Sequence, residues 1–421
     1  MPNWTGAEGL MSAATSEAPA GGQDTRIIAL IGTGHFLSHF YILCLPPLFL
    51  VWREEFGASY AELGLTVALM SGTTALLQTP VGFAVDRYGA RPFLVGGTLI
   101  MALAISAMAF APGVWALWLL AILSGVGNSV IHPADYAILA GSIRQDRMGR
   151  AFAMHTFTGN LGFALAPPII ALLMTMMGWR EALLLVGLLG MPVVGAILLQ
   201  SRILKDQAKA KSAEQAGQSG RELLLSRPML LFFVFFLLSA AAGSGIQAFV
   251  ITVLGKLWAT PIATASMVLT GYMAGATGGT LIGGWFVDRT KGRGLMGFVT
   301  ILTLFAMAMF LVLGLVAMPE IALPGVGLLA GLAMGASRTP RDVMLKDACP
   351  PGQIGKVFGF VSSGLPLGGA ITPVPLGFLI DMGYPILVLP VVAGLLGLSL
   401  LCAGSARASS NAAKTRAVAA E

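Results

Sequence analysis

The sequence predicts an all-α integral membrane protein with twelve transmembrane helices in two pseudo-symmetric bundles of six. Three observations lead to this fold class. The 421 residues are 56% hydrophobic and only 10% charged, whereas soluble domains have about 25% charged residues. Apolar runs of bilayer-spanning length, about 20 residues, recur along the whole chain. Finally, two short blocks of the first half recur in the second half.

The apolar runs are bounded by polar residues or by Pro and Gly, and in chain order they give twelve expected spans. These are 27–51, 62–84, 92–111, 114–141, 151–177, 182–201, 229–254, 263–287, 295–318, 322–345, 356–380 and 385–404. The polar linker 202–228 is the longest break, so bundles are expected over 27–201 and 229–404.

The two ends of the chain are expected to be cytoplasmic tails. Residues 1–26 are rich in Gly, Ala and Ser, and we expect them to be disordered. They lack the basic stretch followed by an apolar stretch that marks a signal peptide. Residues 405–421 have a similar composition and the same interpretation.

The distribution of Lys and Arg predicts the orientation in the membrane. One alternate set of connections, with both tails, carries 20 of the 25 basic residues, and the opposite set carries only Arg53, Arg180 and Lys256. Cytoplasmic loops are enriched in basic residues. We therefore expect both termini to be cytoplasmic, in a multi-pass protein of the inner (plasma) membrane. The net charge of +6 reflects this asymmetry and does not call for a nucleic-acid partner.

Two blocks recur with nearly constant spacing. GFAVDRYGARP at 82–92 matches GWFVDRTKGRG at 284–294, and HPAD at 132–135 matches TPRD at 339–342. This indicates a duplicated six-helix unit. Such an arrangement of six helices and six puts a substrate site at the interface between the repeats, near the bilayer midplane.

The pattern G-x-x-x-D-R-x-G-x-R after the second span, with its echo after the eighth, resembles the major facilitator superfamily. The resemblance covers nearly the whole chain. It implies two helical bundles that rock around a central site, with a cytoplasmic gate that holds the outward-facing state. By position, the gate residues are Asp86, Arg87, Arg91, Asp288, Arg289 and Arg293.

A narrower resemblance concerns the first and fourth spans. GHFLSHFYILCLPPLF and SVIHPADYAIL are similar to the fosmidomycin-resistance type of drug exporter. The chain departs from antiporters of the superfamily at two points. Ala121 stands where they often carry an Arg, and Ala166-Pro167 replaces a Gly-Pro motif. The resemblance favours efflux, and the departures leave uptake open.

Ionisable groups inside spans are costly and usually mark a pathway. All four histidines lie in the first half: His35 and His39 in span 1, His132 in span 4 and His155 in span 5. His132 shares a helix face with Asp135. Imidazole changes charge near physiological pH, so these five residues are candidates for a proton relay or for substrate binding.

Span 10 carries Arg338 and Arg341, three residues apart. A buried guanidinium matches carboxylate and phosphate groups, so both are candidate anion-binding residues. Pro133 and Pro340, at matched positions, predict helix bends that form the floor of the central site. Asn160 and Gln247 are weaker candidates, because uncharged polar residues often only bridge helices.

The leading hypothesis is a proton-coupled secondary transporter for a small organic solute, which we expect to be anionic, working by alternating access with efflux slightly favoured. Alternatives are an organic-anion uptake symporter or uniporter, and a divalent transition-metal transporter built on the four histidines. Nothing in the sequence supports a receptor, a scaffold or an enzyme. The three scattered cysteines form no metal or disulfide pattern, so we expect a monomer without cofactor or resident metal, whose partners are the solute, protons and the lipid bilayer.

Overall fold

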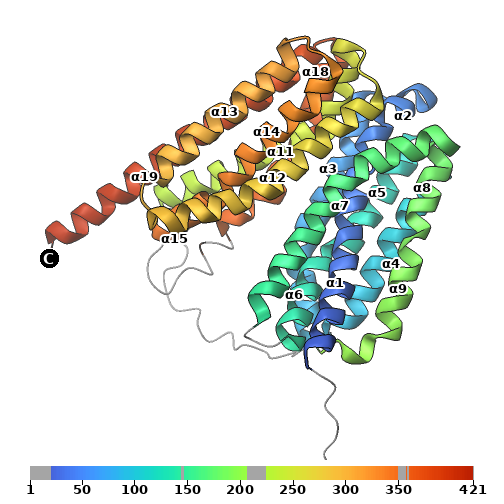
Figure 1. The fold of residues 1–421 in the computed structure, drawn as a ribbon, viewed down its shortest axis with the longest axis horizontal. Helices are drawn as coiled ribbons and strands as arrows, with labels where there is room; N and C mark the ends of the chain where they lie inside the picture. The colour runs from blue at the N-terminus through green and yellow to red at the C-terminus, as the bar shows by residue number, and fades with distance from the viewer. Residues whose placement is uncertain (1–19, 144–146, 206–223, 349–356, 358–359, 421) are drawn as a thin grey trace, which may run out of the picture.

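A computed structural model describes residues 20–143, 147–205, 224–348, 357 and 360–420. The described residues form helices joined by short turns, without a strand. Figure 1 shows two bundles side by side, the first in blue to green and the second in yellow to red. This confirms the expected fold class.

The first half contains the helices of spans 1 to 6. Their bounds are α1 (Ala20–Leu43), η1 (Pro46–Leu48), α2 (Phe49–Phe56), α3 (Tyr60–Tyr88), α4 (Ala90–Met108), α5 (Val114–Ser129), α6 (Ile131–Ser142), α7 (Met148–Met177), α8 (Trp179–Leu188), α9 (Gly190–Leu199) and η3 (Ser201–Ile203).

The second half contains the helices of spans 7 to 12. Their bounds are α11 (Arg227–Trp258), α12 (Ile262–Thr290), α13 (Leu295–Leu315), η5 (Glu320–Ala322), α14 (Leu323–Ala336), α15 (Arg338–Ala348), α17 (Gly364–Ile371), α18 (Pro373–Asp381), η6 (Pro385–Leu387) and α19 (Val388–Ala420).

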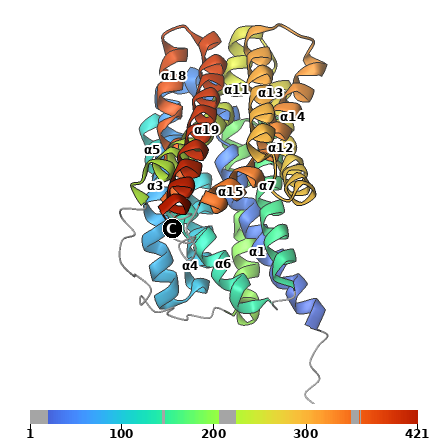
Figure 2. The same cartoon turned by 90° about the vertical axis from the view of Figure 1, so that its left-hand side faces the viewer.

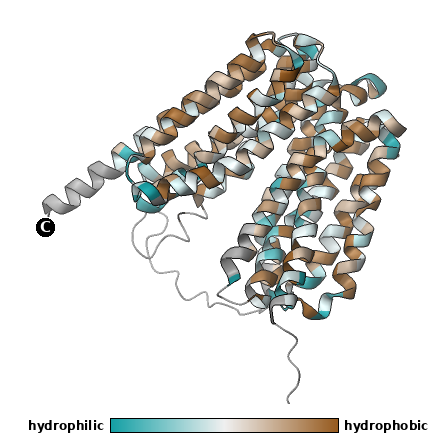
Figure 3. Cartoon of the chain, viewed as in Figure 1, coloured by the Kyte–Doolittle hydropathy of each residue, from teal (hydrophilic) through white to brown (hydrophobic). Residues whose placement is uncertain are grey.

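Eleven of the described segments are long and apolar enough to cross a membrane. The twelfth, α12, has 29 residues and falls outside this set because Gly and Thr dilute its apolar residues. Large apolar side chains such as Leu199 and Leu281 are exposed on the outer surface, where lipid would cover them. Figure 3 shows the brown apolar colouring running along the outer helices of both bundles.

The helices extend beyond the expected spans at both ends of the chain. α1 begins at Ala20, so 20–26 are helical where we expected disorder, and Asp24 is paired with Arg147 at 3.5 Å. α19 continues to Ala420, where we expected the span to end at 404. Ala, Arg and Lys in this segment favour a helix. The expected tail residues 1–19 lie outside the described part of the chain.

Two helices are interrupted near the prolines singled out in the sequence. α5 gives way to α6 at Val130, three residues before Pro133, and α14 gives way to α15 at Ser337, three residues before Pro340. A proline clashes with the carbonyl four residues earlier, which places each break close to where it occurs. The bends that the two prolines predict coincide with these breaks.

The two halves meet at one end and diverge toward the other. The largest contacts between them join α3 to α17 and α18, and α7 to α12. We call the end where α3 begins and α18 finishes the closed end. The opposite end, toward which the ribbons diverge in Figure 1, is where η3 ends the first half and α11 begins the second, and we call it the open end. Figure 2 shows the helices of both halves running along a common direction.

Candidate transport site

A cavity of about 400 Å³ lies between the two halves. The first half contributes Ile42, Leu43, Pro46, Val67, Ser71 and Phe163, while α11, α12, α13, α14, α15, α17 and α19 of the second half supply the remaining lining residues. The cavity walls are therefore built mainly by the second half. Its position between the halves is the one that the internal repeat predicts.

Arg338 is the first residue of α15 and lines this cavity with Tyr272, Gln247 and Ser337. It forms no hydrogen bond or ion pair with any other residue that the structure describes. The break at Ser337 ends α14 just before it, so the side chain projects from a helix start at the middle of the bundle. Arg338 is therefore an uncompensated positive charge facing an internal cavity.

Arg341 also lines the cavity, but its charge is already engaged. Its Nη2 lies 2.9 Å from Oδ1 of Asp342, and its Nε donates to the same oxygen at 3.0 Å. Its guanidinium also lies 4.0 Å from the centre of the Phe236 ring. Of the two predicted arginines, only Arg338 is left to attract an anion.

The polar lining consists mostly of uncharged groups. Gln247 lies at the cavity as predicted, whereas Asn160 does not. Several hydroxyls already donate to backbone carbonyls of their own half, such as Ser244 to Gly369 at 3.0 Å and Ser399 to Leu396 at 2.7 Å. Such a hydroxyl already donates its one hydrogen in a hydrogen bond but can still accept hydrogen bonds. The lining therefore suits a ligand that carries hydroxyl groups of its own.

The histidines gather at a different place, inside the first half between α1, α6 and α7. The ring of His35 stacks on that of His155 at 3.6 Å and lies 4.3 Å from His39 and 5.0 Å from His132. None of the four histidines lines the cavity, and neither do Asp135, Pro133 or Pro340. The expected shared site at the floor of the cavity is therefore two separate sites, because α6 packs within the first half.

A buried hydrogen-bond chain runs through this cluster. Nδ1 of His35 donates to the carbonyl of His155 at 2.7 Å, and Nε2 of His155 lies 2.9 Å from Oδ2 of Asp135. A carbonyl can only accept, so Nδ1 of His35 carries a hydrogen. Asp135 is fully buried and His155 nearly so, and the contact between them holds one proton whichever residue owns it.

Four buried polar atoms of the cluster have no partner: Nε2 of His35, Nδ1 of His39, Nδ1 of His132 and Oδ1 of Asp135. Nitrogen atoms of the first three residues lie within 4.8 Å of one another, close enough to share a metal ion or a proton. Gly159 makes room for the rings, because a Cβ there would lie 2.4 Å from Cε1 of His35. Because Nδ1 of His35 carries that ring's hydrogen, its unpartnered Nε2 offers a lone pair toward the other two histidines.

The predicted gate residues lie at the open end. Arg87, Arg289 and Arg293 are exposed, and the guanidinium of Arg87 lies 5.2 Å from the Tyr88 ring. Arg91 is half-buried, with its Nε unpartnered. The side chains of Asp86 and Asp288 lie outside what the structure describes. The gate contacts that the resemblance implies thus remain a prediction.

At the closed end, Asp381 of α18 contacts Arg53 and the first residues of α3. The sequence analysis counted Arg53 only toward the orientation and did not single out Asp381. One signal was available for Asp381 alone: it is an isolated charge just after an apolar span, on the side with few basic residues.

The family model described as Major Facilitator Superfamily matches residues 31–257 and 237–419. One relative is the multi-drug resistance efflux pump PmrA of Streptococcus pneumoniae, which is 26% identical over 359 residues, covering 81% of this chain and 86% of the pump. Another is a probable L-galactonate transporter of Escherichia coli, 28% identical over 138 residues. This second match covers 33% of this chain and only 30% of that transporter.

Solved structures of the same architecture match nearly the whole chain. The nucleoside transporter NupG superposes with a TM-score of 0.74 at 16% identity, covering 91% of this chain and 98% of NupG. A bacterial homologue of the human lysosomal transporter Spinster, in an inward-facing and occupied conformation, gives a TM-score of 0.72 at 15% identity. It covers 93% of this chain and 97% of that structure. At these identities the similarity establishes the shared fold.

Proposed function

The chain belongs to the Major Facilitator Superfamily and is a membrane transporter, not an enzyme, and from this premise we propose that it moves a small organic anion in exchange for, or together with, protons. The single observation that carries the proposal is the uncompensated Arg338 in the cavity between the halves. Transport proceeds by alternating access, in which the two halves rock around the cavity.

The orientation follows from the basic residues. The connections at the open end belong to the set that holds 20 of the 25 Lys and Arg residues, and cytoplasmic loops are enriched in basic residues, so we infer that the open end is cytoplasmic. On this assignment the structure is inward-open, with Arg338 reachable from the cytoplasm. We infer that the described helices span the inner membrane.

The anion preference rests on the cost of an isolated charge. Inserting an arginine at the centre of a membrane helix costs about 2.5–3.5 kcal/mol on insertion scales. Asp342 lies nearby but is engaged by Arg341. A carboxylate or similar anion in the cavity would offset the cost at Arg338 through a bidentate contact. Two relatives are named for organic anions, L-galactonate and sulfoacetate.

Protons are assigned to the cluster in the first half. The shared proton between His155 and Asp135, and the unpartnered nitrogens beside it, give this site capacity for one further proton. The ring of Tyr136, which is 45% exposed, lies 5.2 Å from that of His155, and we infer that protons reach the cluster past this ring. Because the anion site and the proton site lie in different places, coupling acts through the movement of the halves.

The direction of transport is the finer part of the proposal. Multidrug efflux pumps among the relatives favour efflux by proton antiport. The relatives named for organic anions, and the residues in which the chain departs from antiporters, favour uptake as a symporter or uniporter. We place efflux slightly ahead.

A second candidate function is transport of a divalent transition metal. It is favoured by the three histidine nitrogens that lie within 4.8 Å of one another, since imidazole binds such metals well. Against it, the cavity between the halves contains Arg338 and Arg341 and none of the histidines. The same experiment separates the two functions.

The test is a thermal-shift screen of the purified protein with L-galactonate, sulfoacetate, phosphonates, cationic drugs and Zn²⁺. A ligand that binds only the native state raises the melting temperature by mass action. We expect an anion to stabilise the wild type and Arg341→Gln, and to give no shift with Arg338→Gln. Shifts from cations or Zn²⁺ alone, retained in Arg338→Gln, would overturn the anion proposal.

A further inference from the structure

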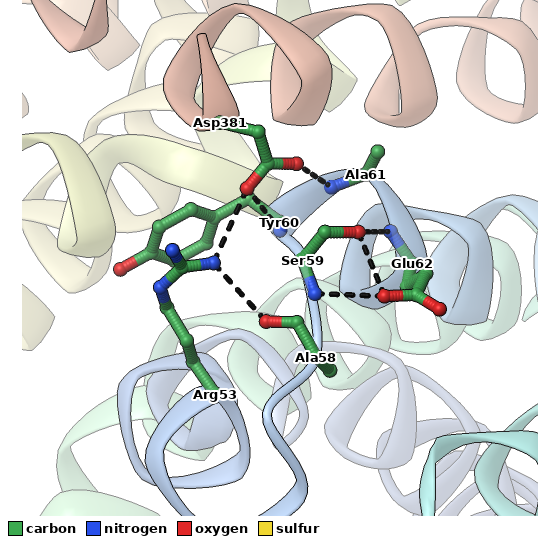
Figure 4. Close-up of polar contacts among 7 residues, drawn as sticks. All are labelled: Arg53, Ala58, Ser59, Tyr60, Ala61, Glu62 and Asp381. Atoms are coloured by element: carbon green, nitrogen blue, oxygen red, sulfur yellow. Dashed lines mark hydrogen bonds and ion pairs between the residues drawn. The ribbon is translucent and has the colours of Figure 1, made fainter. Parts of the chain in front are cut away.

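Asp381, the last residue of α18, reaches from the second half to the first half at the closed end. Its Oδ1 accepts from the backbone N–H of Tyr60 at 2.7 Å, and its Oδ2 accepts from that of Ala61 at 2.8 Å. Nη1 of Arg53 lies 3.2 Å from the same Oδ1. Figure 4 shows the carboxylate spanning the start of α3.

These contacts complete the N-terminus of a helix with a group from the opposite half. The first N–H groups of a helix have no partner within it. In α3, Ser59 caps the third, since its Oγ accepts from the N–H of Glu62 at 3.1 Å and its own N–H donates to Oε2 of Glu62 at 2.8 Å. The first two N–H groups, those of Tyr60 and Ala61, donate to the carboxylate of Asp381 instead. A carboxylate at this position is also favoured by the helix dipole.

Arg53 holds the carboxylate from the side of the first half. Its Nη1 also donates to the carbonyl of Ala58 at 3.1 Å, and its guanidinium lies 4.5 Å from the Tyr60 ring. The side chain of Asp381 is only 17% exposed. Arg53 is thus fixed by its own half in a position to meet the carboxylate.

The backbones of α3 and α18 touch directly beneath this contact. A Cβ on Gly377 would lie 2.3 Å from the carbonyl oxygen of Tyr60, and one on Gly64 would lie 2.6 Å from that of Pro373. Asp381 follows Gly377 by one helical turn and so lies on the same face. We call the packed contact between α3 and α18 a seam. It can open only if these backbone contacts and those of Asp381 break together.

The symmetry-related seam between α7 and α12 is built differently. Among the described residues, its polar link is a hydroxyl contact from Thr270 to the carbonyl of Ala164 at 2.9 Å. In the part of the chain that the structure describes, the charged contact made by Asp381 therefore belongs to the seam between α3 and α18 and has no counterpart between α7 and α12.

We propose that Asp381 is the latch that keeps the closed end shut, and that its release from α3 and Arg53 accompanies every opening of that end. The proposal rests on alternating access as the proposed mode of transport. It does not depend on the solute or on protons, and its test uses neither.

The test measures distances between spin labels by double electron–electron resonance in lipid nanodiscs, with the native cysteines replaced by serine. Phe110 and Ile321 are 71% and 92% exposed at the closed end and carry one pair of labels. Leu199 and Ser405 at the open end carry the other pair. In wild type we expect mostly the short distance between 110 and 321.

Asp381→Asn should lengthen the distance between 110 and 321 and shorten that between 199 and 405, changing the ratio of the two populations by about tenfold. The amide keeps one acceptor oxygen but loses the charge and the second acceptor, and about tenfold is the size expected for losing one hydrogen bond to a charged group. Arg53→Gln leaves the two N–H contacts in place and should give a smaller change in the same direction.

The matched control is Glu55→Gln, which removes a carboxylate at the same end whose ion pair with Arg180 stays within one half. It should leave both distance distributions as in wild type. Distributions for Asp381→Asn and Arg53→Gln that both equal those of wild type would overturn the proposal. So would a change of equal size in Glu55→Gln. If Asp381→Asn fails to fold, Arg53→Gln alone decides by the same comparison.

Discussion

The two arginines of span 10 carry the same charge, but their neighbours determine whether that charge is available to a ligand. The sequence placed both in a membrane span and therefore predicted a role for both. Only contacts show that Arg341 is neutralised by Asp342, one residue away, and that Arg338 is left free. Similarly, the sequence placed the histidines in neighbouring spans, yet their separation from the cavity depends on how α6 packs. The contact between Asp381 and Tyr60 joins residues 321 positions apart, and no local pattern reveals such a pair.

The two arginines should affect the stability of the ligand-free protein in opposite ways. Arg338→Gln removes an uncompensated charge, so its melting temperature should equal or exceed that of wild type. Arg341→Gln loses an ion pair and the contact with the Phe236 ring, together worth about 1 kcal/mol, and should melt lower. Thermal unfolding of both variants in the same detergent checks this. A lower melting temperature for Arg338→Gln than for Arg341→Gln would mean that Arg338 is structural.

At the proton site, Asp135→Asn should abolish the coupling of transport to protons while leaving the movement of the two halves intact. The amide cannot exchange a proton with His155, so transport driven by a pH gradient should fall by at least tenfold. Exchange of labelled for unlabelled solute, which needs no net proton transfer, should remain within about twofold of wild type. Both rates are measured in proteoliposomes, with Asn160→Ala as a control from the neighbouring helix α7. Full gradient-driven transport by Asp135→Asn would remove the proton role of this cluster.

At the scale of elements, the prolines proved informative. The breaks near Pro133 and Pro340 follow from the lost hydrogen bond and steric clash of proline, which are local effects. The close approach of α12 to α14, whose backbones touch at glycines, emerged only in the structure. The end of a helix that continues beyond the membrane, such as α19, could not be predicted. The length of an apolar run limits only the part of a helix that lies within the bilayer.

The pair of α12 and α14 supplies a matched test. A Cβ on Gly275 would lie 2.1 Å from the carbonyl oxygen of Leu328, whereas one on Gly278 meets nothing within 4 Å. Gly275→Ala should therefore destabilise the protein by about 1–3 kcal/mol, the usual range for overpacking. Gly278→Ala should be neutral or stabilising. Thermal unfolding of the two variants checks this, and equal melting temperatures would contradict the close packing of this pair.

At the scale of the whole molecule, the number of spans, the division into halves and the repeat were all predictable, because each depends on apolar length or on duplicated sequence. The conformation was not. Whether the halves meet at one end or the other depends on small differences between two sets of contacts, and both conformations are encoded by the same twelve helices. The structure adds that the closed end is the one held by Asp381.

The orientation is testable with single cysteines in a background without the native ones. Tyr88→Cys at the open end should react with a membrane-impermeant maleimide only in inside-out vesicles. Phe110→Cys at the closed end should react only in right-side-out vesicles or intact cells. Both parent residues are well exposed, at 65% and 71%. The reverse pattern of labelling would invert the assignment of inward and outward conformations.

The central claim is that an anion bound at Arg338 is carried by a protein that takes its protons elsewhere. The most direct test is gradient-driven transport in proteoliposomes of the anion that gives the largest thermal shift, comparing wild type, Arg338→Gln and Arg341→Gln. The account predicts movement driven by a pH gradient in wild type, its loss in Arg338→Gln, and substantial retention in Arg341→Gln. Transport that survives Arg338→Gln unchanged, or that ignores the pH gradient in wild type, would contradict it.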